Sequence, residues 1–346
     1  MRVLVTGATG FLGSHLLATL LARGDQIVAL CREEEPELSD QGVTVKRGDV
    51  LDRASVLAAA HGCEGVYHAA GKVSRLSSDA EELYKLHVDG TRNVLAASRE
   101  AGVQRVVVAS TSGTIAVSED PEHIATERDE PPVALISRWP YYRAKLYAER
   151  VALEANKNGL EVVCVNPTLL LGPGDVRGSS TDDVRRFLER RIPAVPAGGI
   201  SFVDVRDAAV GMQLAMEKGT AGARYLLGAC NLTIREFFAR LSRVSGVRAP
   251  WLPMPRYPEL TRTFAKLFDG SIAPFLDAGV DPVSLEMAQY YWYLDSSLAE
   301  RDLGWAARDP SKTLGDTIED MRSRGVVWWS GATFNPSFVA EGRSST

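Results

Sequence analysis

The chain has 346 residues, of which 45% are hydrophobic and 24% charged, a balance typical of a soluble globular protein. The net charge of −5 comes from 39 basic and 44 acidic residues, so no basic excess favours a nucleic-acid-binding surface. The four cysteines are scattered without metal-ligand spacing, which favours buried thiols in a reducing compartment. There is neither an apolar run of membrane-spanning length nor a signal-peptide pattern at the N-terminus. We therefore expect a cytoplasmic protein without a metal site, a membrane segment or a nucleic-acid partner.

Short apolar segments alternate with helical ones over the first half of the chain. The expected strands are 2–6, 26–31, 42–50, 65–71, 104–111 and 160–168, and the expected helices are 12–23, 52–62, 80–102 and 139–155. Near-continuous apolar strands separated by helices indicate a parallel sheet that helices cover on both faces. The sequence therefore predicts an α/β fold with a doubly wound, Rossmann-type parallel sheet. In such a sheet, ligands bind beyond the carboxyl ends of the strands.

The pattern changes after about residue 170, where glycine and proline become frequent and the alternation of strands and helices weakens. We expect a dinucleotide-binding domain over 1–170, a smaller C-terminal substrate-binding lobe over 171–330, and a polar tail over 331–346. Elements near 200–228 are expected to return to the sheet, which would make the lobe discontinuous.

A glycine triplet lies between the first expected strand and the first expected helix. Glycine permits a tight turn and a close approach of the backbone to a pyrophosphate, while the helix N-terminus offers unpaired N–H groups and a positive dipole end. A purely structural turn is the alternative, but the strand–turn–helix context favours a dinucleotide loop. The predicted cofactor contacts in this loop are Gly7, Thr9, Gly10, Phe11, Leu12 and Gly13.

The second expected strand ends in Cys31 and Arg32, at the position where a dinucleotide-binding protein contacts the adenosine ribose. An Asp or Glu there would bind the 2′-hydroxyl of NAD, whereas an arginine suits the 2′-phosphate of NADP. Arg32 could instead be a solvated charge offset by the three glutamates that follow it. We expect NADP as the cofactor, with NAD as the alternative.

Two further strand ends are expected to contact the cofactor. Asp49 could accept a hydrogen bond from the adenine amino group, with Val50 donating from its backbone, or it could be the N-cap of the next helix. The small residues Ala69, Ala70 and Gly71 would let a cofactor pass over the edge of the sheet.

Two tyrosines precede a lysine in the segment 139–150, with Tyr141 four residues and Tyr142 three residues before Lys145. Residues at i and i+4 share a helix face, so Tyr141 can touch Lys145, whereas Tyr142 lies roughly 100° around the helix. The lysine ammonium would lower the pKa of the tyrosine, and a hydroxyl from Thr111 would hold a substrate oxygen against the phenol. The pair alone often occurs by chance, but beside a dinucleotide loop it indicates a catalytic set.

On these residues the chain resembles the extended short-chain dehydrogenase/reductases, the NAD-dependent epimerase/dehydratase family, from Met1 to about residue 325. The resemblance is carried by TGATGFLG, GDV, HAAG, VDGTRNVL, VVVASTSGT, YYRAK, VNPTLLLGPGD and FVDVRDAA, and it is strongest to the dihydroflavonol-reductase-like subgroup. It implies that Tyr141 rather than Tyr142 is the catalytic acid, and that Lys145 also binds the nicotinamide ribose. It further implies that Thr111 is the catalytic hydroxyl, and that Pro167 and Thr168 contact the cofactor.

The predicted substrate contacts are Lys72, Thr111, Ser112, Tyr141 and Leu169. The sequence departs from the pattern of this family at His87, where relatives usually carry asparagine. The Asp–Glu pair of family dehydratases is also missing after Thr111, which disfavours dehydration. The C-terminal half is rich in aromatic and apolar residues without clustered arginines, which suits an apolar ligand better than a sugar nucleotide unless the aromatics only form that lobe's core.

We therefore expect an NAD(P)-dependent oxidoreductase that reduces a ketone, or oxidises the alcohol, of a hydrophobic or aromatic small molecule. One alternative is a nucleotide-sugar epimerase. Another is a non-catalytic dinucleotide-sensing protein, whose usual mark would be a broken tyrosine–lysine pair. The resemblance also implies a homodimer across the helices 80–102 and 139–155, although their exposed residues are rather polar.

Overall fold

The computed structural model describes residues 1–156, 159–254 and 282–327. The predicted tail, 331–346, lies outside the described residues, and so does most of the segment WLPMPRYPELTRTFAKLF at 251–268, which supplies many of the aromatic and apolar residues noted in the C-terminal half. The described residues form a larger lobe around the main sheet and a smaller lobe around a second sheet.

Seven parallel strands form the main sheet in the order β3–β2–β1–β4–β5–β6–β9. These strands are β1 (Arg2–Thr6), β2 (Gln26–Cys31), β3 (Thr44–Arg47), β4 (Gly65–His68), β5 (Arg105–Ala109), β6 (Glu161–Pro167) and β9 (Arg224–Leu227). The strand order reverses between β1 and β4, so the loops after these two strands diverge and open a crevice at that edge. The predicted α/β fold with a Rossmann-type parallel sheet is confirmed.

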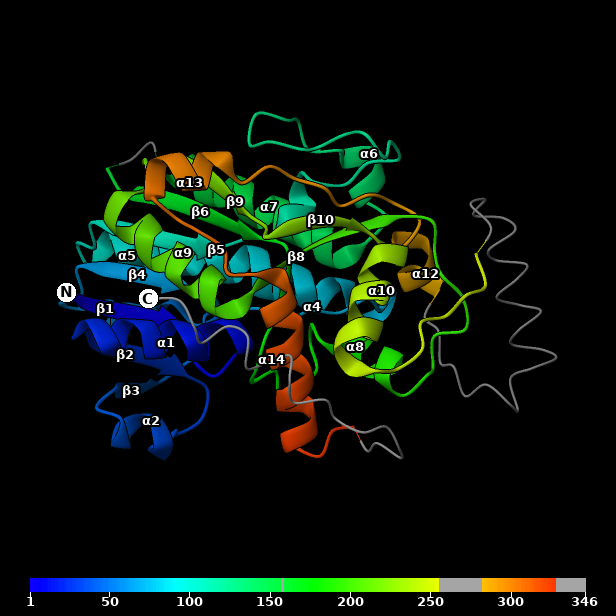
Figure 1. The fold of residues 1–346 in the computed structure, drawn as a ribbon. Helices are drawn as coiled ribbons and strands as arrows, with labels where there is room; N and C mark the ends of the chain where they lie inside the picture. The colour runs from blue at the N-terminus through cyan, green and yellow to red at the C-terminus, as the bar shows by residue number, and fades with distance from the viewer. Residues whose placement is uncertain (157–158, 255–281, 328–346) are drawn as a thin grey trace.

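Helices cover both faces of the main sheet (Figure 1). One face is covered by α1 (Phe11–Arg23) and α9 (Val205–Lys218), and the other by α3 (Arg53–Ala60), α5 (Gly90–Glu100) and α7 (Pro140–Ala155). Alternate strand residues point to opposite faces, so Val3 and Val5 pack under α1 while Leu4 between them packs on the other side. Because both faces are buried, the central strands have nearly continuous apolar sequences, whereas the edge strand β3 is polar and largely exposed.

The long helix expected over 80–102 is interrupted. It comprises α4 (Ala80–Tyr84), a π-helical turn (Lys85–Asp89) and α5. The turn is closely packed against the loop after β3, since a Cβ atom built on Gly90 would lie 3.1 Å from Val50 Cγ2. A π-turn carries one more residue than an α-helical turn, so it shifts the phase of the side chains on either side of it. Hydrophobic periodicity alone does not reveal such an insertion.

The smaller lobe is built on a second sheet, in which β8 (Gly199–Asp204) lies between β7 (Leu169–Leu171) and β10 (Cys230–Thr233). Its core contains stacked and tilted phenylalanine rings, with α8 (Asp182–Leu188), α10 (Ile234–Ser245) and α14 (Pro310–Ser323) packed around them. The remaining described helices are α2 (Pro36–Asp40), the 3₁₀ turns Ser77–Asp79 and Ser112–Thr114, α6 (Val133–Ile136), α12 (Pro282–Met287) and α13 (Ser297–Leu303). The domain boundary near residue 170 stays a prediction.

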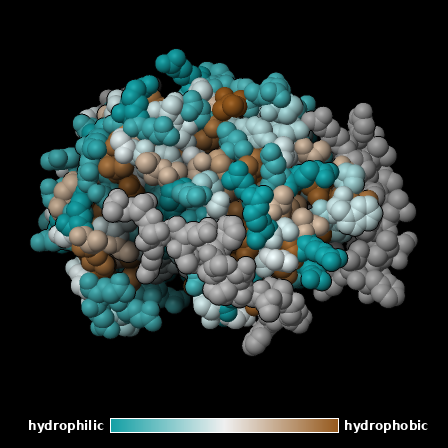
Figure 2. Space-filling view, viewed as in Figure 1, coloured by the Kyte–Doolittle hydropathy of each residue, from teal (hydrophilic) through white to brown (hydrophobic). Residues whose placement is uncertain are grey.

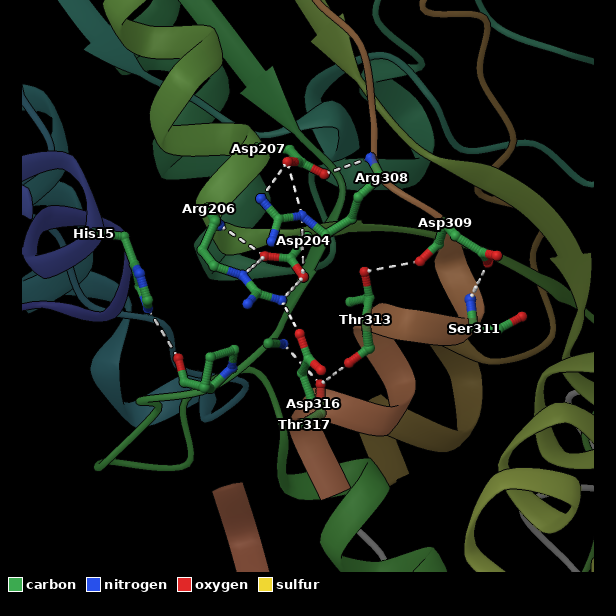
Figure 3. A network of polar contacts seen from close by, with 12 residues as sticks. His15, Asp204, Arg206, Asp207, Arg308, Asp309, Ser311, Thr313, Asp316 and Thr317 are labelled. Atoms are coloured by element: carbon green, nitrogen blue, oxygen red, sulfur yellow. Dashed lines mark hydrogen bonds and ion pairs between the residues drawn. The ribbon is translucent and has the colours of Figure 1, made fainter. Parts of the chain in front are cut away.

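A network of ion pairs joins the two lobes where β8 leads into α9 (Figure 3). The Arg206 guanidinium donates to both carboxylate oxygens of Asp204 at 2.8 and 2.7 Å and also pairs with Asp316 on α14. Arg308 forms a two-pronged contact with Asp207, at 2.9 and 2.7 Å to one oxygen. Asp204 and Asp207 are buried, so each carboxylate requires this pairing.

The loop after β7 is held from both sides (Figure 3). The backbone N–H of Gly172 donates to Thr317 Oγ1 of α14 at 2.8 Å. On the other side, His15 Nε2 on α1 lies 2.9 Å from the carbonyl oxygen of Pro173. The helix that opens with the glycine loop is therefore connected directly to the loop that borders the smaller lobe.

The surface seen in Figure 2 carries hydrophobic residues scattered between hydrophilic ones. Among the described residues, none of the helices has the length and apolarity needed to cross a membrane.

Candidate active site

The carboxyl ends of the central strands open onto one cleft of about 2450 Å³ that continues into the smaller lobe. An ordinary ligand pocket holds roughly 300–1,000 Å³, so this cleft has room for a dinucleotide and a second molecule. All the residues predicted from the sequence as catalytic, cofactor-binding or substrate-binding lie on its wall. The fold therefore brings together segments that are far apart in the sequence, from Gly7 to Leu169.

The glycine loop after β1 is packed without room for side chains. Gly7 has a φ of +75°, and a Cβ atom there would lie 2.6 Å from the backbone of Ala69 and Ala70. A Cβ atom on Gly13 would lie 2.0 Å from the carbonyl oxygen of Gly7. The N–H of Gly10 donates to that same oxygen at 3.0 Å and closes the turn. These positions require glycine for steric reasons.

Helix α1 begins directly after this loop, and the residues of its first turn line the cleft. Its N-cap, Gly10, has no side chain to bond them, and the first turn contains no acidic residue. The first N–H groups of any α-helix lack intrahelical partners and carry the positive end of the helix dipole. The arrangement suits a pyrophosphate, and the backbones of Phe11, Leu12 and Gly13 would hold it.

At the expected adenosine end, Arg32 is exposed and has no hydrogen bond or ion pair with any described residue. Asp49 accepts a hydrogen bond from the N–H of Leu51 at 2.9 Å, so it closes a short turn. The N-cap of α3 is Asp52, which accepts from the N–H of Ala54 at 3.0 Å. The helix therefore starts three residues later than it would if Asp49 were its N-cap, so that alternative is wrong.

Lys145 projects from α7 toward the end of β5, where its Nζ donates to the carbonyl oxygen of Ala109 at 2.8 Å. Burial lowers the pKa of Lys145 to about 8, and the charge of Glu149 opposes this change. Burial raises the pKa of Tyr141. The expected lowering of the tyrosine pKa by Lys145 is not seen, because burial dominates and the ammonium is bonded to Ala109.

The two tyrosines have different neighbours. The ring of Tyr141 packs edge-to-face against His87, with ring centroids 5.6 Å apart. The ring of Tyr142 packs against Trp292 at 5.1 Å and Trp139 at 6.0 Å. Burial raises the pKa of Tyr142 to about 12. Tyr142 is thus part of an aromatic cluster, whereas Tyr141 meets the π-helical turn.

Thr111 lies where β5 ends and the chain turns into the 3₁₀ turn. Its Oγ1 accepts from the N–H of Gly113 at 3.3 Å, and its carbonyl oxygen accepts from Asn166 Nδ2 at 3.1 Å. Thr111 is half-buried on the cleft wall, while Ser112 beside it is buried. The threonine is fixed by its backbone, and its hydroxyl oxygen remains at the cleft.

The other predicted contacts lie at the two sides of the cleft. Thr168 Oγ1 donates to the carbonyl oxygen of Leu227 at 3.2 Å, which fixes the link from β6 to β7. Lys72 is paired with Glu82 at 2.7 Å and Asp79 at 3.0 Å, and these acids raise its pKa. The Lys72 ammonium lines the cleft but already has two carboxylate partners.

His87 was flagged from the sequence as a departure, and the structure shows what it touches. It sits in the π-helical turn, and its Nε2 lies 2.9 Å from the carbonyl oxygen of Lys72. A Cβ atom on Gly71 would lie 2.7 Å from its ring. Burial, with a further contribution from Lys145, lowers the pKa of His87 to about 3, so the ring is neutral. It therefore supports Tyr141 and the loop after β4 by packing.

A second buried histidine, His68, bridges Thr6 of β1 at 2.8 Å and Thr91 of α5 at 3.1 Å. It supports the floor of the cleft from below. The sequence reasoning did not single out Glu149, although its i+4 spacing from Lys145 in the same helix places it on the same side. It gave no separate role to Asn166, which it placed in a segment beside the nicotinamide, and it did not mention Arg224; both bond to Glu149.

Residues 3–228 match the profile of the NAD dependent epimerase/dehydratase family. The chain belongs to this family. A protein of Synechocystis sp., provisionally named dihydroflavonol 4-reductase, is 34% identical over 93% of this chain and 95% of its own length. Sterol demethylase protein B of Methylococcus capsulatus is 34% identical over 94% of this chain and 100% of its own. Cinnamoyl-CoA reductase 1 of Oryza sativa subsp. japonica is 34% identical over 93% and 91% of the two chains.

Solved structures share the same architecture. The structure of gox2253 superposes with a TM-score of 0.78 at 26% identity, covering 94% of this chain and 98% of that one. The UDP-glucose 4-epimerase of Thermus thermophilus, solved in complex with NAD, has a TM-score of 0.72 at 23% identity over 93% and 99% of the chains, and supports the fold alone. The predicted membership of the extended short-chain dehydrogenase/reductases, and with it the predicted enzyme class, is confirmed.

We predict that Tyr141→Phe lowers turnover by about 100-fold or more, because a positioned general acid contributes on the order of 10²–10⁴ to a rate. The affinity for the dinucleotide, measured by fluorescence titration, should stay close to that of the wild type. Tyr142→Phe is the matched control and should retain most of the turnover, since its ring belongs to the aromatic cluster. Equal losses from the two substitutions would contradict the assignment of Tyr141.

Proposed function

We propose that the protein is an NADP-dependent reductase of a ketone in a hydrophobic or aromatic small molecule, similar to the dihydroflavonol reductases. The observation that carries the proposal is that Tyr141, Lys145 and Thr111 lie on the wall of the same cleft as the glycine loop and the start of α1. A dinucleotide held at α1 and a carbonyl held at Thr111 would share this cleft.

The proposed chemistry assigns one task to each of these residues. A dihydronicotinamide held along the cleft would supply the hydride. Tyr141 donates its phenolic proton to the oxygen that becomes the alcohol, and Thr111 holds that oxygen in place. Lys145 stabilises the phenolate that remains and binds the nicotinamide ribose. Because burial raises the pKa of Tyr141, the phenol is protonated at neutral pH, which suits the reducing direction.

The substrate side of the cleft supports an apolar or aromatic ligand. Its wall includes Trp139, Tyr142, Phe237, Met287 and Trp292. Several relatives carry names that specify such substrates, among them cinnamoyl-CoA reductases and a ketoreductase of Stigmatella aurantiaca that acts on a farnesyl-dihydroquinoline oxide. These names support the substrate class proposed for this chain.

One observation favours the nucleotide-sugar epimerase as a second candidate. We expected no clustered arginines in this lobe, but the run RRFLERR at 185–191 supplies two of the four that lie at the cleft: Arg75, Arg177, Arg186 and Arg191. Acidic residues offset part of this charge, since Arg75 lies 3.3 Å from Asp183 and Arg186 lies 3.0 Å from Asp182. Because acidic residues already offset part of the positive charge that the phosphates of a sugar nucleotide would need, we rank the reductase first. The intact tyrosine–lysine pair argues against a non-catalytic dinucleotide sensor.

A substrate panel separates the two candidates. We expect the protein to oxidise NADPH stoichiometrically with at least one aromatic or long-chain ketone, as measured by absorbance at the nicotinamide band and by product analysis. UDP- and dTDP-sugars form the second half of the panel. Epimerisation of a sugar nucleotide without net consumption of NADPH, with every ketone left unchanged, would refute the reductase proposal and support the epimerase.

Cofactor preference is proposed to depend on Arg32. We predict that NADPH binds more tightly than NADH, and that Arg32→Ala removes this preference, because a charge-assisted contact to a phosphate contributes about 1.5–3 kcal/mol. Fluorescence titration with both dinucleotides measures the effect. Arg177→Ala, which removes another exposed arginine of the cleft, is the control. Tighter binding of NADH by the unmodified protein would show that the prediction is wrong.

We propose a homodimer and a cytoplasmic location. The four cysteines are free thiols, as in proteins of a reducing compartment. Tyr84 on α4 and Tyr147 on α7 are each 40% exposed and pack edge-to-face at 6.3 Å, which leaves an aromatic patch on the outer face of this helix pair. No nucleic-acid partner is proposed.

Light scattering tests the dimer. We expect a mass of twice the 37.5 kDa of one chain at micromolar concentration, and Tyr147→Asp should shift it toward the monomer. The exposed Arg150 on the same helix provides a control, since Arg150→Ala should leave the mass unchanged if the aromatic patch forms the contact. A mass of one chain for the unmodified protein would refute the proposal.

A further inference from the structure

A buried carboxylate lies behind the cleft wall at Glu149, one helical turn beyond Lys145. It is 2% exposed. Its Oε2 accepts hydrogen bonds from Ser110 Oγ, from Thr114 Oγ1 at 3.1 Å and from Asn166 Nδ2 at 2.6 Å. Its Oε1 accepts from Arg224 Nη1 at 3.1 Å. Glutamate is rarely buried to this degree, and four donors compensate the cost of removing this carboxylate from water.

Three of the four donors come from the segments at the ends of β5 and β6, which carry Thr111 and Thr168, and the fourth, Arg224, is on β9. Ser110 directly precedes Thr111 at the end of β5. Asn166 directly precedes Pro167 and Thr168 at the end of β6. Glu149 itself belongs to α7, the helix that carries Tyr141 and Lys145. A single carboxylate therefore connects the ends of two strands to the catalytic helix.

The charge of Glu149 also faces Lys145 through the protein interior. No direct ion pair joins these two side chains in the part of the chain that the structure describes, yet both line a small polar cavity of about 10 Å³. Burial lowers the pKa of Lys145, and Glu149 is the first group that opposes this change, followed by Cys164 on β6. The other titratable groups around Lys145 are Tyr141 on its own helix, His87 in the π-turn and His68 on β4.

We propose that Glu149 is the positioning residue of this site: its carboxylate aligns the strand ends that carry Thr111 and Thr168, and its buried negative charge faces Lys145. The proposal rests on the role proposed above for Lys145. It assigns Glu149 no contact with the substrate or the dinucleotide. It acts through Lys145 and through the two strand ends.

A simpler role would be that Glu149 is only the counter-ion of Arg224. Arg224 also makes hydrogen bonds elsewhere. It donates to the carbonyl oxygen of Glu127 at 3.2 and 3.1 Å and to that of Asp129 at 3.3 Å. It therefore holds the loop between β5 and α7. If the ion pair were purely structural, removing either partner would give the same result. If Glu149 acts on Lys145, removing Glu149 lowers the pH at which the lysine titrates, and removing Arg224 does not.

The experiment measures the titration of Lys145 directly. Reductive methylation of the full-length protein at a series of pH values, read by peptide mass spectrometry, gives the midpoint at which the Lys145 amine becomes reactive. We expect a midpoint near pH 8 in the wild type. Glu149→Gln should lower it by roughly one pH unit or more, because a nearby opposite charge favours the ammonium by about that amount. Arg224→Gln should leave it unchanged or raise it, because the carboxylate then keeps its full charge.

Glu154→Gln removes an exposed carboxylate from the same helix and is the matched control, with the midpoint of the wild type expected. A folded Glu149→Gln protein with an unshifted midpoint would overturn the proposal. If that variant does not fold, as judged by near-ultraviolet circular dichroism, Arg224→Gln decides: a lowered midpoint in that protein contradicts the proposal.

Turnover gives a second readout. With a ketone that the wild type reduces, the alkaline limb of kcat should move to lower pH in Glu149→Gln by the same shift as the labelling midpoint. Lys145→Met tests the catalytic role of the lysine separately. If Glu149→Gln shifts the labelling midpoint but Lys145→Met leaves turnover unchanged, the proposed catalytic role of Lys145 is refuted, while the link between Glu149 and Lys145 stands. The failures of the two proposals are therefore distinguishable.

Discussion

The close approach of two backbones at the end of β1 is the constraint on which the cleft depends. Gly7 lies against Ala69 and Ala70 with no space for a Cβ atom, and Gly13 lies equally close to Gly7. This contact lies at the point where the strand order reverses, between β1 and β4. His68 supports the contact from below through hydrogen bonds to both sides. The floor of the cleft is therefore fixed by backbone and buried side chains before any ligand contributes.

The catalytic side of the cleft is fixed in a different way, by polar groups in the interior. Lys145 is tied to β5 through Ala109, and Thr111 is tied to β6 through Asn166. Such bonds are strong in a medium of low dielectric constant, and leaving one unmade is costly. Geometry at the reacting groups is thus set by several satisfied hydrogen bonds, whereas the aromatic residues of the smaller lobe shape the space in front of them.

The sequence alone predicted most of the main sheet, because its strands, apart from the exposed edge strand β3, are mostly apolar runs between clear helix signals. It also placed Gly7, Gly13 and Tyr141 at the cleft, since their spacing has a local steric or helical cause. It missed features that only tertiary packing creates. Asp49 and Asp52 are equally good caps by residue type, and only the start of α3 decides between them. Two arginines of the cleft, Arg186 and Arg191, belong to the run RRFLERR at 185–191, but only the folded chain shows that this run lies beside Arg75 at the cleft.

The π-helical turn has a consequence for how this chain is compared with others. It behaves as a one-residue insertion, so side chains before it and after it are rotated out of the phase of a continuous helix by roughly 100°. His87 faces Tyr141 only in this register. A relative whose helix runs straight through this point would present a neighbouring residue to the tyrosine instead. Gap-free sequence alignments across 85–89 would then pair positions that do not occupy the same place in space.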